Sequence, residues 1–234
     1  MADRVELEPR AGGVLCLTLQ GETALNIFDL EMRDELIAAV AAAADLPDAR
    51  AVVLRARGPH FSAGADLKDF GAVASVVERR RIRWDRDPWT PLWELGLPIV
   101  VAMSGVAIGA GLEMSMLGDV RYAAPDAVLS LPEPRLGMLP SAGGTQSALR
   151  AVGISRALRL CLLGDRLDAH EALRLGLVNR VVDDPEAEAL SLAARLAAVP
   201  PGTLRSVRLL AHAALETGLE SGLALERTHA RLAR

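Results

Sequence analysis

The chain has 234 residues, of which 51% are apolar, 24% charged and 3% aromatic, and its formal net charge is −4. This length is enough for one large domain with a buried core, and the apolar content excludes a disordered chain. The acidic balance disfavours a nucleic-acid-binding protein, because contacts to phosphate groups require a basic surface.

Strand and helix patterns alternate over the first hundred residues. The apolar run Val14–Leu19 ends at a glycine, which predicts a strand. Apolar spacing over Asp29–Ala44 predicts a helix with Asp29 as its N-cap. Two further apolar runs, Ala51–Leu54 and Pro98–Met103, predict strands. Apolar strands separated by helices indicate an α/β fold whose sheet is covered on both faces.

After about residue 145 the sequence is predicted to be almost entirely helical. Asp168 and Glu171 have the spacing of a capping box, at the start of a helix that ends at Gly176. Asn179–Val182 predicts a brief extended piece. Amphipathic patterns broken by Pro200-Pro201-Gly202 predict three more helices, over Pro185–Val199, Thr203–Leu215 and Leu219–Leu232. We expect one folding unit, with a core over residues 1–182 and a helical C-terminal region over residues 183–234.

No segment predicts export or membrane insertion. The first residues, Met1–Glu6, are charged and lack the apolar core of a signal peptide, which favours a cytoplasmic protein. Residues 95–112 carry no charge over 18 positions, a length at which a membrane span must be considered. Pro98 and four glycines within this segment, with Glu113 directly after it, instead indicate a strand, a glycine turn and a buried helix.

The side chains that most often bind metals show no ligand pattern. Cys16 and Cys161 each lie among leucines, which predicts small buried side chains and neither a disulfide nor a metal site. The four histidines, which share no ligand spacing, are His60, His170, His212 and His229. We therefore expect no metal site.

Three glycine-rich segments follow predicted strands and contain or adjoin acidic residues. They are Phe61–Leu67, Gly105–Glu113, and Leu131–Gly137 with Pro140–Thr145. Small residues after a strand let main-chain N–H groups approach a ligand, and the N-terminus of a following helix adds partial positive charge. Two such loops could direct two amides at one oxygen atom, which is an oxyanion hole. None of these segments matches the dinucleotide-binding or phosphate-loop pattern.

Glu113 and Glu133 are the acidic residues that most favour chemistry. Glu113 lies early in a predicted helix, where an acid also stabilises the helix through its dipole. Glu133 lies between two prolines at the end of the apolar run Val128–Leu131, where an exposed turn acid is also expected. Two carboxyl groups in apolar surroundings can be driven to different protonation states, which is what an acid/base pair needs. Both interpretations stay open for each residue.

Five segments, taken in order, resemble the enoyl-CoA hydratase/isomerase (crotonase) family. They are Phe61–Leu67, Gly105–Asp119, Pro132-Glu133 with Leu136-Gly137, Gly143–Thr145 and Gly176–Val182. The resemblance covers residues 14 to 182 and continues more loosely beyond them. It implies a spiral of repeated β-β-α units with a helical C-terminal region, assembled as a trimer or a dimer of trimers. The sequence stops at Arg234, whereas typical members of that family continue through one or two more helices.

The same resemblance implies an acyl-CoA thioester as substrate, with its carbonyl oxygen bound by the N–H groups of Ala65 and Ala110. Because coenzyme A is part of that substrate, no separate cofactor is expected. Further contacts to the substrate are implied for Ala24, Ala63, Asp66, Leu67, Lys68, Gly109, Gly111, Pro132 and Gly137. Lys68, the only lysine in the chain, would lie near the phosphates of the nucleotide. Gly21-Glu22-Thr23 stands where relatives often have a lysine or arginine.

Enoyl-CoA hydratases carry glutamates at both positions that Glu113 and Glu133 match, whereas many relatives with other reactions lack one or both. The resemblance therefore implies reversible syn addition of water to a 2-enoyl-CoA, which gives a 3-hydroxyacyl-CoA. By family analogy, Glu113 positions and deprotonates the water and Glu133 donates the proton, although a coupled pair can share it. The alternatives are an isomerase or decarboxylase on the same scaffold, or a catalytically silent subunit that binds acyl-CoA.

A basic and aromatic stretch allows other interpretations. It contains Arg79, Arg80, Arg81, Arg83 and Arg86 together with the three tryptophans of the chain, Trp84, Trp89 and Trp93. Such a stretch can bind nucleic acid or a membrane surface. We expect instead a solvated helix face or, following the resemblance, a segment over the acyl pocket. Neither a nucleic-acid partner nor a membrane span is expected.

Overall fold

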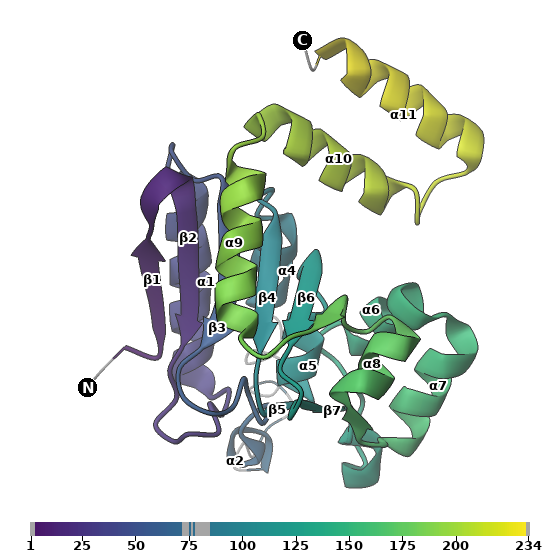
Figure 1. Ribbon diagram of the computed structural model, residues 1–234. Coiled ribbons are helices and arrows are strands. Elements are labelled where there is room, and N and C mark those ends of the chain that lie inside the picture. Colours follow the sequence, from purple (N-terminus) through teal and green to yellow (C-terminus); the bar gives the residue numbers. More distant parts are fainter. Residues whose placement is uncertain (1–2, 72–74, 76, 78–84, 233–234) are drawn as a thin grey trace.

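A six-stranded sheet forms the centre of the computed structural model, which describes residues 3–232 except 72–74, 76 and 78–84 (Figure 1). The strand order is β1-β2-β3-β4-β6-β9, in which β1 is antiparallel to β2 and all other neighbours are parallel. The strands are β1 (Val5–Pro9), β2 (Val14–Leu19), β3 (Ala51–Ala56), β4 (Ile99–Met103), β6 (Val120–Ala123) and β9 (Arg180–Val181). The three apolar runs predicted as strands are confirmed as β2, β3 and β4.

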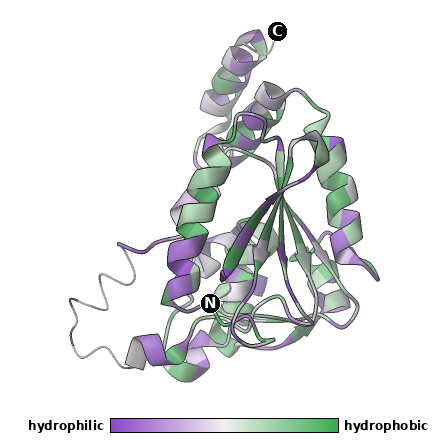
Figure 2. Ribbon diagram, turned by 90° about the vertical axis from the view of Figure 1, so that its left-hand side faces the viewer, coloured by the Kyte–Doolittle hydropathy of each residue, from purple (hydrophilic) through white to green (hydrophobic). Residues whose placement is uncertain are grey.

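Helices cover both faces of this sheet, as its apolar strands predict. They are α1 (Leu30–Asp45) and α4 (Trp89–Glu94) on one face, and α9 (Pro185–Ala197) on the other. Figure 2 shows the sheet between helices on its two sides. Alternate side chains of β2 separate the two cores: Leu17 packs in the cluster of α1, whereas Cys16 packs in the cluster of α9. The buried Ala189 and Ala193 lie one turn apart, so α9 approaches the strands closely.

A smaller sheet, with order β5-β7-β8, carries the elements that surround the site. Its strands are β5 (Val106–Ile108), β7 (Val128–Ser130) and β8 (Leu167–Asp168). The chain passes from β4 to β5 and then into helix α5 (Ala110–Ser115), and it passes again from β6 to β7 and then into the 3-10 turn η2 (Glu133–Leu136). Each passage places one strand in each sheet before a helical segment, so the α/β spiral is confirmed.

The remaining elements are short connections and helices at the two ends of the molecule. They are η1 (Ala11–Gly13), α2 (Leu67–Gly71), α6 (Gly144–Val152), α7 (Ile154–Leu163), α8 (Ala169–Leu175), α10 (Pro201–Ala213) and α11 (Leu219–Leu232). The predicted break before α10 is confirmed, but the helix begins at Pro201, two residues before the predicted start at Thr203. Proline suits the first position of a helix, where its missing N–H has no partner to lose.

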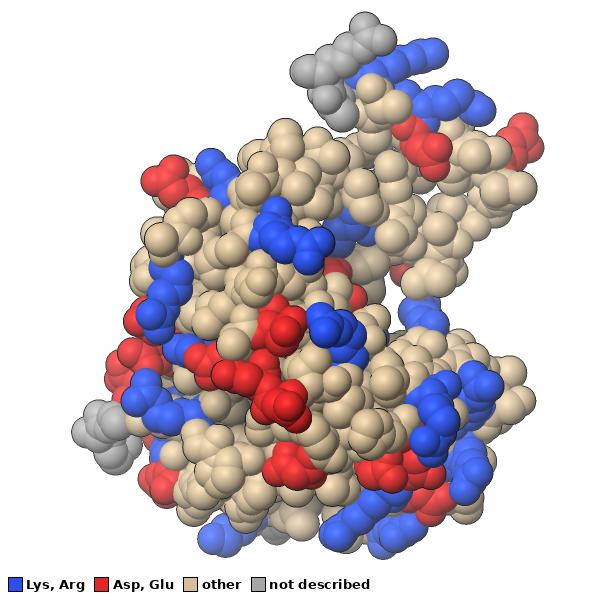
Figure 3. Space-filling view, in the orientation of Figure 1, with Lys and Arg blue, Asp and Glu red and all other residues tan. Residues whose placement is uncertain are grey.

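Helices α10 and α11 lie at one end of the molecule (Figure 1), and α10 contacts the rest of it through the ion pair of Arg208 with Asp119. Neither has a buried residue among those described, and Leu219 is 80% exposed. A hollow of about 430 Å³, visible in Figure 3, lies between α10 and the ends of α5 and α6. The predicted boundary at residue 182 falls before α9, although α9 packs on the large sheet. The division into a core and a C-terminal region therefore stays a prediction.

The described residues contain no candidate for a membrane-spanning helix and no candidate cluster of metal ligands. Within those residues, no helix has both the length and the apolar character that crossing a membrane requires. The same residues contain no group of three or more acidic, histidine or cysteine side chains placed to bind a metal ion. Cys16 and Cys161 are both buried and unpaired, as predicted.

The capping box of α8 predicts a measurable loss of stability when its N-cap is removed. Asp168 Oδ1 accepts a hydrogen bond of 2.7 Å from the N–H of Glu171, and Glu171 Oε2 accepts one of 3.4 Å from the N–H of Asp168. Asp168→Ala should lower the free energy of unfolding by about 1 kcal/mol, whereas Asp168→Asn keeps a capping oxygen and should lose less. Urea denaturation measures both. An equal loss in the two variants would contradict a role in capping.

Candidate active site

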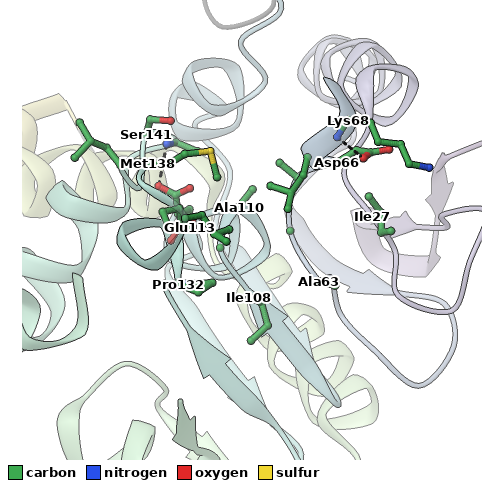
Figure 4. Close-up of a pocket in the computed structure, with 18 of the residues that line it drawn as sticks. Ile27, Ala63, Asp66, Lys68, Ile108, Ala110, Glu113, Pro132, Met138 and Ser141 are labelled. Atoms are coloured by element: carbon green, nitrogen blue, oxygen red, sulfur yellow. Dashed lines mark hydrogen bonds between the residues drawn. The ribbon is translucent and has the colours of Figure 1, made fainter. Parts of the chain in front are cut away.

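A cavity of about 400 Å³ opens between the three glycine-rich segments (Figure 4). Ala63–Lys68 forms one wall, Ile108–Ala110 lies in the middle, and the turn around Glu133 forms the opposite wall together with Glu113. In Figure 4, Asp66 and Lys68 lie on one side of Ala110 and Glu113 lies on the other. The structure therefore brings together parts of the sequence that the glycine-rich pattern singles out separately.

Main-chain hydrogen bonds place the first two segments side by side. Ser62 N–H donates to Val106 O at 3.0 Å, and Ile108 N–H donates to Ser62 O at 3.0 Å. Gly64 has a φ of +94°, and a Cβ there would lie 2.7 Å from Ile108 O. Only glycine combines that conformation with so close an approach. Loop 62–65 can therefore lie directly against the turn that begins α5.

Two unpaired amides line the cavity at this junction. Among the described residues, neither the N–H of Ala65 nor that of Ala110 donates a hydrogen bond to a protein group. The two belong to adjacent walls, because a Cβ at Gly64 would lie only 3.5 Å from the nitrogen of Ala110. Ala110 is also the first residue of α5, whose leading N–H groups have no partner within the helix. Unpaired donors at a cavity wall are suited to bind an oxygen atom.

Glu113, the fourth residue of α5, is the most deeply buried acid at the site, with 3% exposure. Its Oε1 accepts hydrogen bonds from the N–H groups of Ala142, at 2.9 Å, and Gly144, at 2.8 Å. Burial raises the pKa of Glu113 from its ordinary 4.5 to about 7. The two N–H donors lower this pKa and the nearby Glu133 raises it, but burial has the largest effect.

Glu133 begins the turn η2 and faces the same cavity. Its Oε2 is buried and has no hydrogen-bond partner among the described residues. Burial raises the pKa of this carboxyl group above its ordinary value. A Cβ at Gly109 would lie 2.9 Å from Glu133 Oε1, so the carboxyl group lies against the same turn that presents Ala110.

The chain matches the family model described as enoyl-CoA hydratase/isomerase over residues 9–231. It belongs to the enoyl-CoA hydratase/isomerase family. It is 34% identical to a probable enoyl-CoA hydratase of Mycobacterium bovis, over 95% of this chain and 86% of that protein. It is 35% identical to the 2,3-dehydroadipyl-CoA hydratase of Escherichia coli, over 92% and 84% of the two chains. A crystal structure of enoyl-CoA hydratase from Thermoplasma volcanium, 31% identical, matches with a TM-score of 0.92 over 99% of this chain and 92% of that chain.

Most site residues that the family resemblance implies lie in the wall of one cavity. These are Ala63, Ala65, Asp66, Leu67, Lys68, Gly109, Ala110, Glu113, Pro132 and Glu133. Three others are not in that wall. Ala24 is exposed, Gly111 is buried where a Cβ would lie 2.6 Å from Ser62 O, and Gly137 ends η2 with a φ of +69°. The conformation of Gly137 and the packing of Gly111 give these glycines a structural explanation.

Nine further residues of the described cavity wall were not predicted as site residues. Gly64, Ile108, Leu136, Ser141 and Ala142 belong to the glycine-rich segments, whereas Ile27, Arg33, Met138 and Leu139 lie outside them. Arg33 is 6% exposed, although a charged residue on an amphipathic helix normally indicates the solvent face. Its Nη1 donates to the carbonyl of Arg86 at 3.4 Å, and its guanidinium lies 5.6 Å from the centre of the Phe28 ring. Leu136, Met138 and Leu139 are apolar residues next to Gly137 in the sequence. That apolar pattern in a turn is the sequence feature that could have indicated this part of the cavity wall.

The basic and aromatic stretch is only partly described. Arg79, Arg80, Arg81, Arg83 and Trp84 lie outside the described residues. Arg86 forms an ion pair of 3.5 Å with Asp34 on α1. Trp89 stacks on Phe28, with ring centres 5.1 Å apart, and Trp93 stacks on His212, with centres 4.0 Å apart. The tryptophans that the structure describes therefore pack within the protein.

The raised pKa of Glu113 predicts a pH-dependent stability. The folded chain binds this proton more tightly than the unfolded chain, so ionisation destabilises the fold as the pH rises from 4.5 to 7. Glu113→Gln removes this effect. The variant should gain stability over the parent across this range, by up to about 3 kcal/mol. Urea denaturation at several pH values tests this, and a stability difference that does not change with pH would refute it.

Gly144 should tolerate no side chain, because it lies against Glu113. A Cβ at Gly144 would lie 2.7 Å from Glu113 Oε1 and 2.9 Å from its Cγ. Gly144→Ala should displace the carboxylate from its N–H donors and raise the pKa of Glu113 further. Carbon-13 NMR titration of the carboxyl groups measures the shift. Gly202→Ala is the matched control because it meets open space on α10, and an equal, small effect in both variants would contradict the prediction.

Proposed function

We propose that the chain is an enoyl-CoA hydratase, which adds water reversibly to the C2–C3 double bond of a 2-enoyl-CoA and gives a 3-hydroxyacyl-CoA. The observation that carries this proposal is the pair Glu113 and Glu133 in the wall of one cavity that also presents two unpaired amides. The relatives named as a probable enoyl-CoA hydratase and a 2,3-dehydroadipyl-CoA hydratase support it.

The amides of Ala65 and Ala110 supply the electrostatic part of the proposed mechanism. They donate hydrogen bonds to the thioester carbonyl oxygen and draw electron density away from C3. When water adds to C3, negative charge develops on that oxygen as an enolate, and the same donors stabilise it more strongly than the neutral carbonyl. Since these donors are held by loop 62–65 and by the start of α5, they need little reorganisation during the reaction.

The surroundings of the two glutamates favour Glu113 as the base and Glu133 as the acid. The N–H groups of Ala142 and Gly144 stabilise the ionised form of Glu113, and a pKa of about 7 suits a base at neutral pH. The buried Oε2 of Glu133 has no such donor among the described residues, which favours its protonated form. Glu113 takes a proton from water, the hydroxide oxygen bonds to C3, and Glu133 gives its proton to C2. Proton exchange between the two carboxyl groups restores the starting state.

The proposed hydration uses two carboxyl groups and two amides of the chain, so we expect no cofactor beyond the coenzyme A of the substrate. Lys68 is exposed at the cavity mouth, where its ammonium group can contact a phosphate of the nucleotide. The exposed leucines of α11 are consistent with self-association as a trimer or a dimer of trimers. We expect a cytoplasmic enzyme.

A panel of 2-enoyl-CoA esters of different chain length tests the function. Hydration removes the conjugated thioester, so its ultraviolet absorbance falls, and mass spectrometry shows a product that has gained one water. Isomerisation or decarboxylation would give no such gain. A catalytically silent subunit would bind the esters without turnover across the whole panel.

The two-carboxylate mechanism predicts that neither glutamate can be replaced. Glu113→Gln and Glu133→Gln should each lower kcat by about 10²- to 10⁴-fold. The double variant should be little worse than either single variant, because the pair acts as a unit. Asp126→Asn, at an exposed turn outside the cavity, is the control. Near-parental turnover in either glutamine variant would refute the mechanism.

A further inference from the structure

The two ends of one helical hairpin hold the two carboxyl groups of the site. Glu113 is bound by the N–H groups of Ala142 and Gly144, at the start of α6. The turn that carries Glu133 lies against the end of α7. Helices α6 and α7 are joined at the single residue Gly153 and pack on each other. The separation of the two carboxyl groups therefore depends on this hairpin.

Arg135 makes the principal polar link between η2 and α7. Its Nε donates to the carbonyl of Leu163, the last residue of α7, at 2.6 Å, and its Nη2 donates to Asp165 Oδ1 at 3.1 Å. The carbonyl groups at a helix end have no partner within the helix, so the guanidinium satisfies one of them. Next to this contact, a Cβ at Gly164 would lie 2.9 Å from Pro132 Cα, which shows how closely the turn is seated.

Hydrogen bonds inside the turn fix its shape but not its place. Arg135 N–H donates to Pro132 O at 3.0 Å, and Met138 N–H donates to Glu133 O at 2.9 Å. Both bonds would survive if the whole turn moved relative to α7. The contacts of the Arg135 side chain cross from one element to the other, so they locate the turn against the hairpin.

We propose that Arg135 is a positioning residue, which ties η2 to the end of α7 and so fixes the carboxyl group of Glu133 relative to that of Glu113. The proposal rests on the proposed hydration reaction, in which both groups act on one substrate. Arg135 is not among the residues that line the cavity in the described part of the chain. It therefore acts through Glu133 and touches no reacting atom.

Loss of the Arg135 side chain should change the position of the Glu133 carboxyl group more than it changes the free energy of unfolding. The side chain of Arg135 is 58% exposed, and exposed ion pairs such as that with Asp165 contribute little to the free energy of unfolding. The ionisable groups that face Glu133 from neighbouring elements are Glu113 on α5 and Cys161 on α7, whose thiol has its pKa raised by burial and by the two glutamates. Substitution of Arg135 leaves those groups in place.

Three variants separate positioning from a general effect of charge. Arg135→Ala removes the link, and Arg135→Lys keeps a charged donor that can still reach a carbonyl oxygen. Arg159→Ala is the matched control: Arg159 also approaches Asp165, at 3.6 Å, and is 76% exposed, but it lies on α7 and not on the turn that carries Glu133. Arg135→Ala should lower kcat for enoyl-CoA hydration by about tenfold or more with KM within about twofold of the parent. Arg135→Lys should recover part of the rate, and Arg159→Ala should match the parent.

A second measurement does not depend on turnover. Carbon-13 NMR titration, with the Glu133 signal assigned from Glu133→Gln, should show the pKa of Glu133 falling towards its ordinary value in Arg135→Ala. The loosened turn admits water and removes the burial that raises this pKa. Arg159→Ala should leave it unchanged.

The two measurements distinguish failure of the function from failure of the positioning role. If the parent hydrates no enoyl-CoA but the pKa of Glu133 falls only in Arg135→Ala, the proposed function is wrong and the positioning role stands. If Arg135→Ala matches Arg159→Ala in the pKa of Glu133 and in any rate, the positioning role is overturned. If Arg135→Ala does not fold, the same comparison is made with Arg135→Lys.

Discussion

Ionising a carboxyl group buried as deeply as that of Glu113 costs free energy of desolvation. The site depends on the interactions that offset this desolvation. Two main-chain N–H groups at the start of α6 bind one oxygen atom of this carboxyl group. They offset part of the desolvation, so the group titrates near neutral pH and can exist in both forms there. The glycine at position 144 is required by the same contact, because any larger residue would occupy the space of the carboxylate.

Glu133 has different hydrogen-bonding surroundings from Glu113, so the two carboxyl groups are not equivalent. Burial acts on both acids, but compensating N–H donors are present for Glu113, whereas Oε2 of Glu133 has no partner among the described residues. Different surroundings for two identical side chains are what separates an acid from a base. The placement of Gly109 between Glu133 and the amide of Ala110 brings this asymmetry next to the unpaired donors. The carboxyl group of Glu133 and the unpaired amide of Ala110 therefore lie at the same turn of the chain.

The sequence predicted the elements whose signal is local. The N-cap Asp29, the capping box at Asp168 and the apolar strands are all determined by residues close to one another, and the structure shows each of them. The glycine-rich pattern indicated the segments of the site, and the family resemblance supplied the spiral arrangement of the α/β fold. The features that the sequence could not predict depend on contacts between residues far apart in the chain. The donors to Glu113 lie 29 and 31 positions away, and nothing in Ala142 itself marks its amide as a partner. Arg33 is buried by Phe28 and the segment at Arg86, which a helical pattern cannot show.

The single lysine of the chain lies, exposed, at the mouth of the cavity. Reagents that attach dyes, biotin or a solid support to amines would therefore modify one side chain, and that side chain lies at the entrance to the site. Immobilising the protein through cysteine is equally restricted, since both thiols are buried. A label or surface anchor that leaves the entrance open has to be introduced at an exposed position outside the cavity, such as the turn at Asp126.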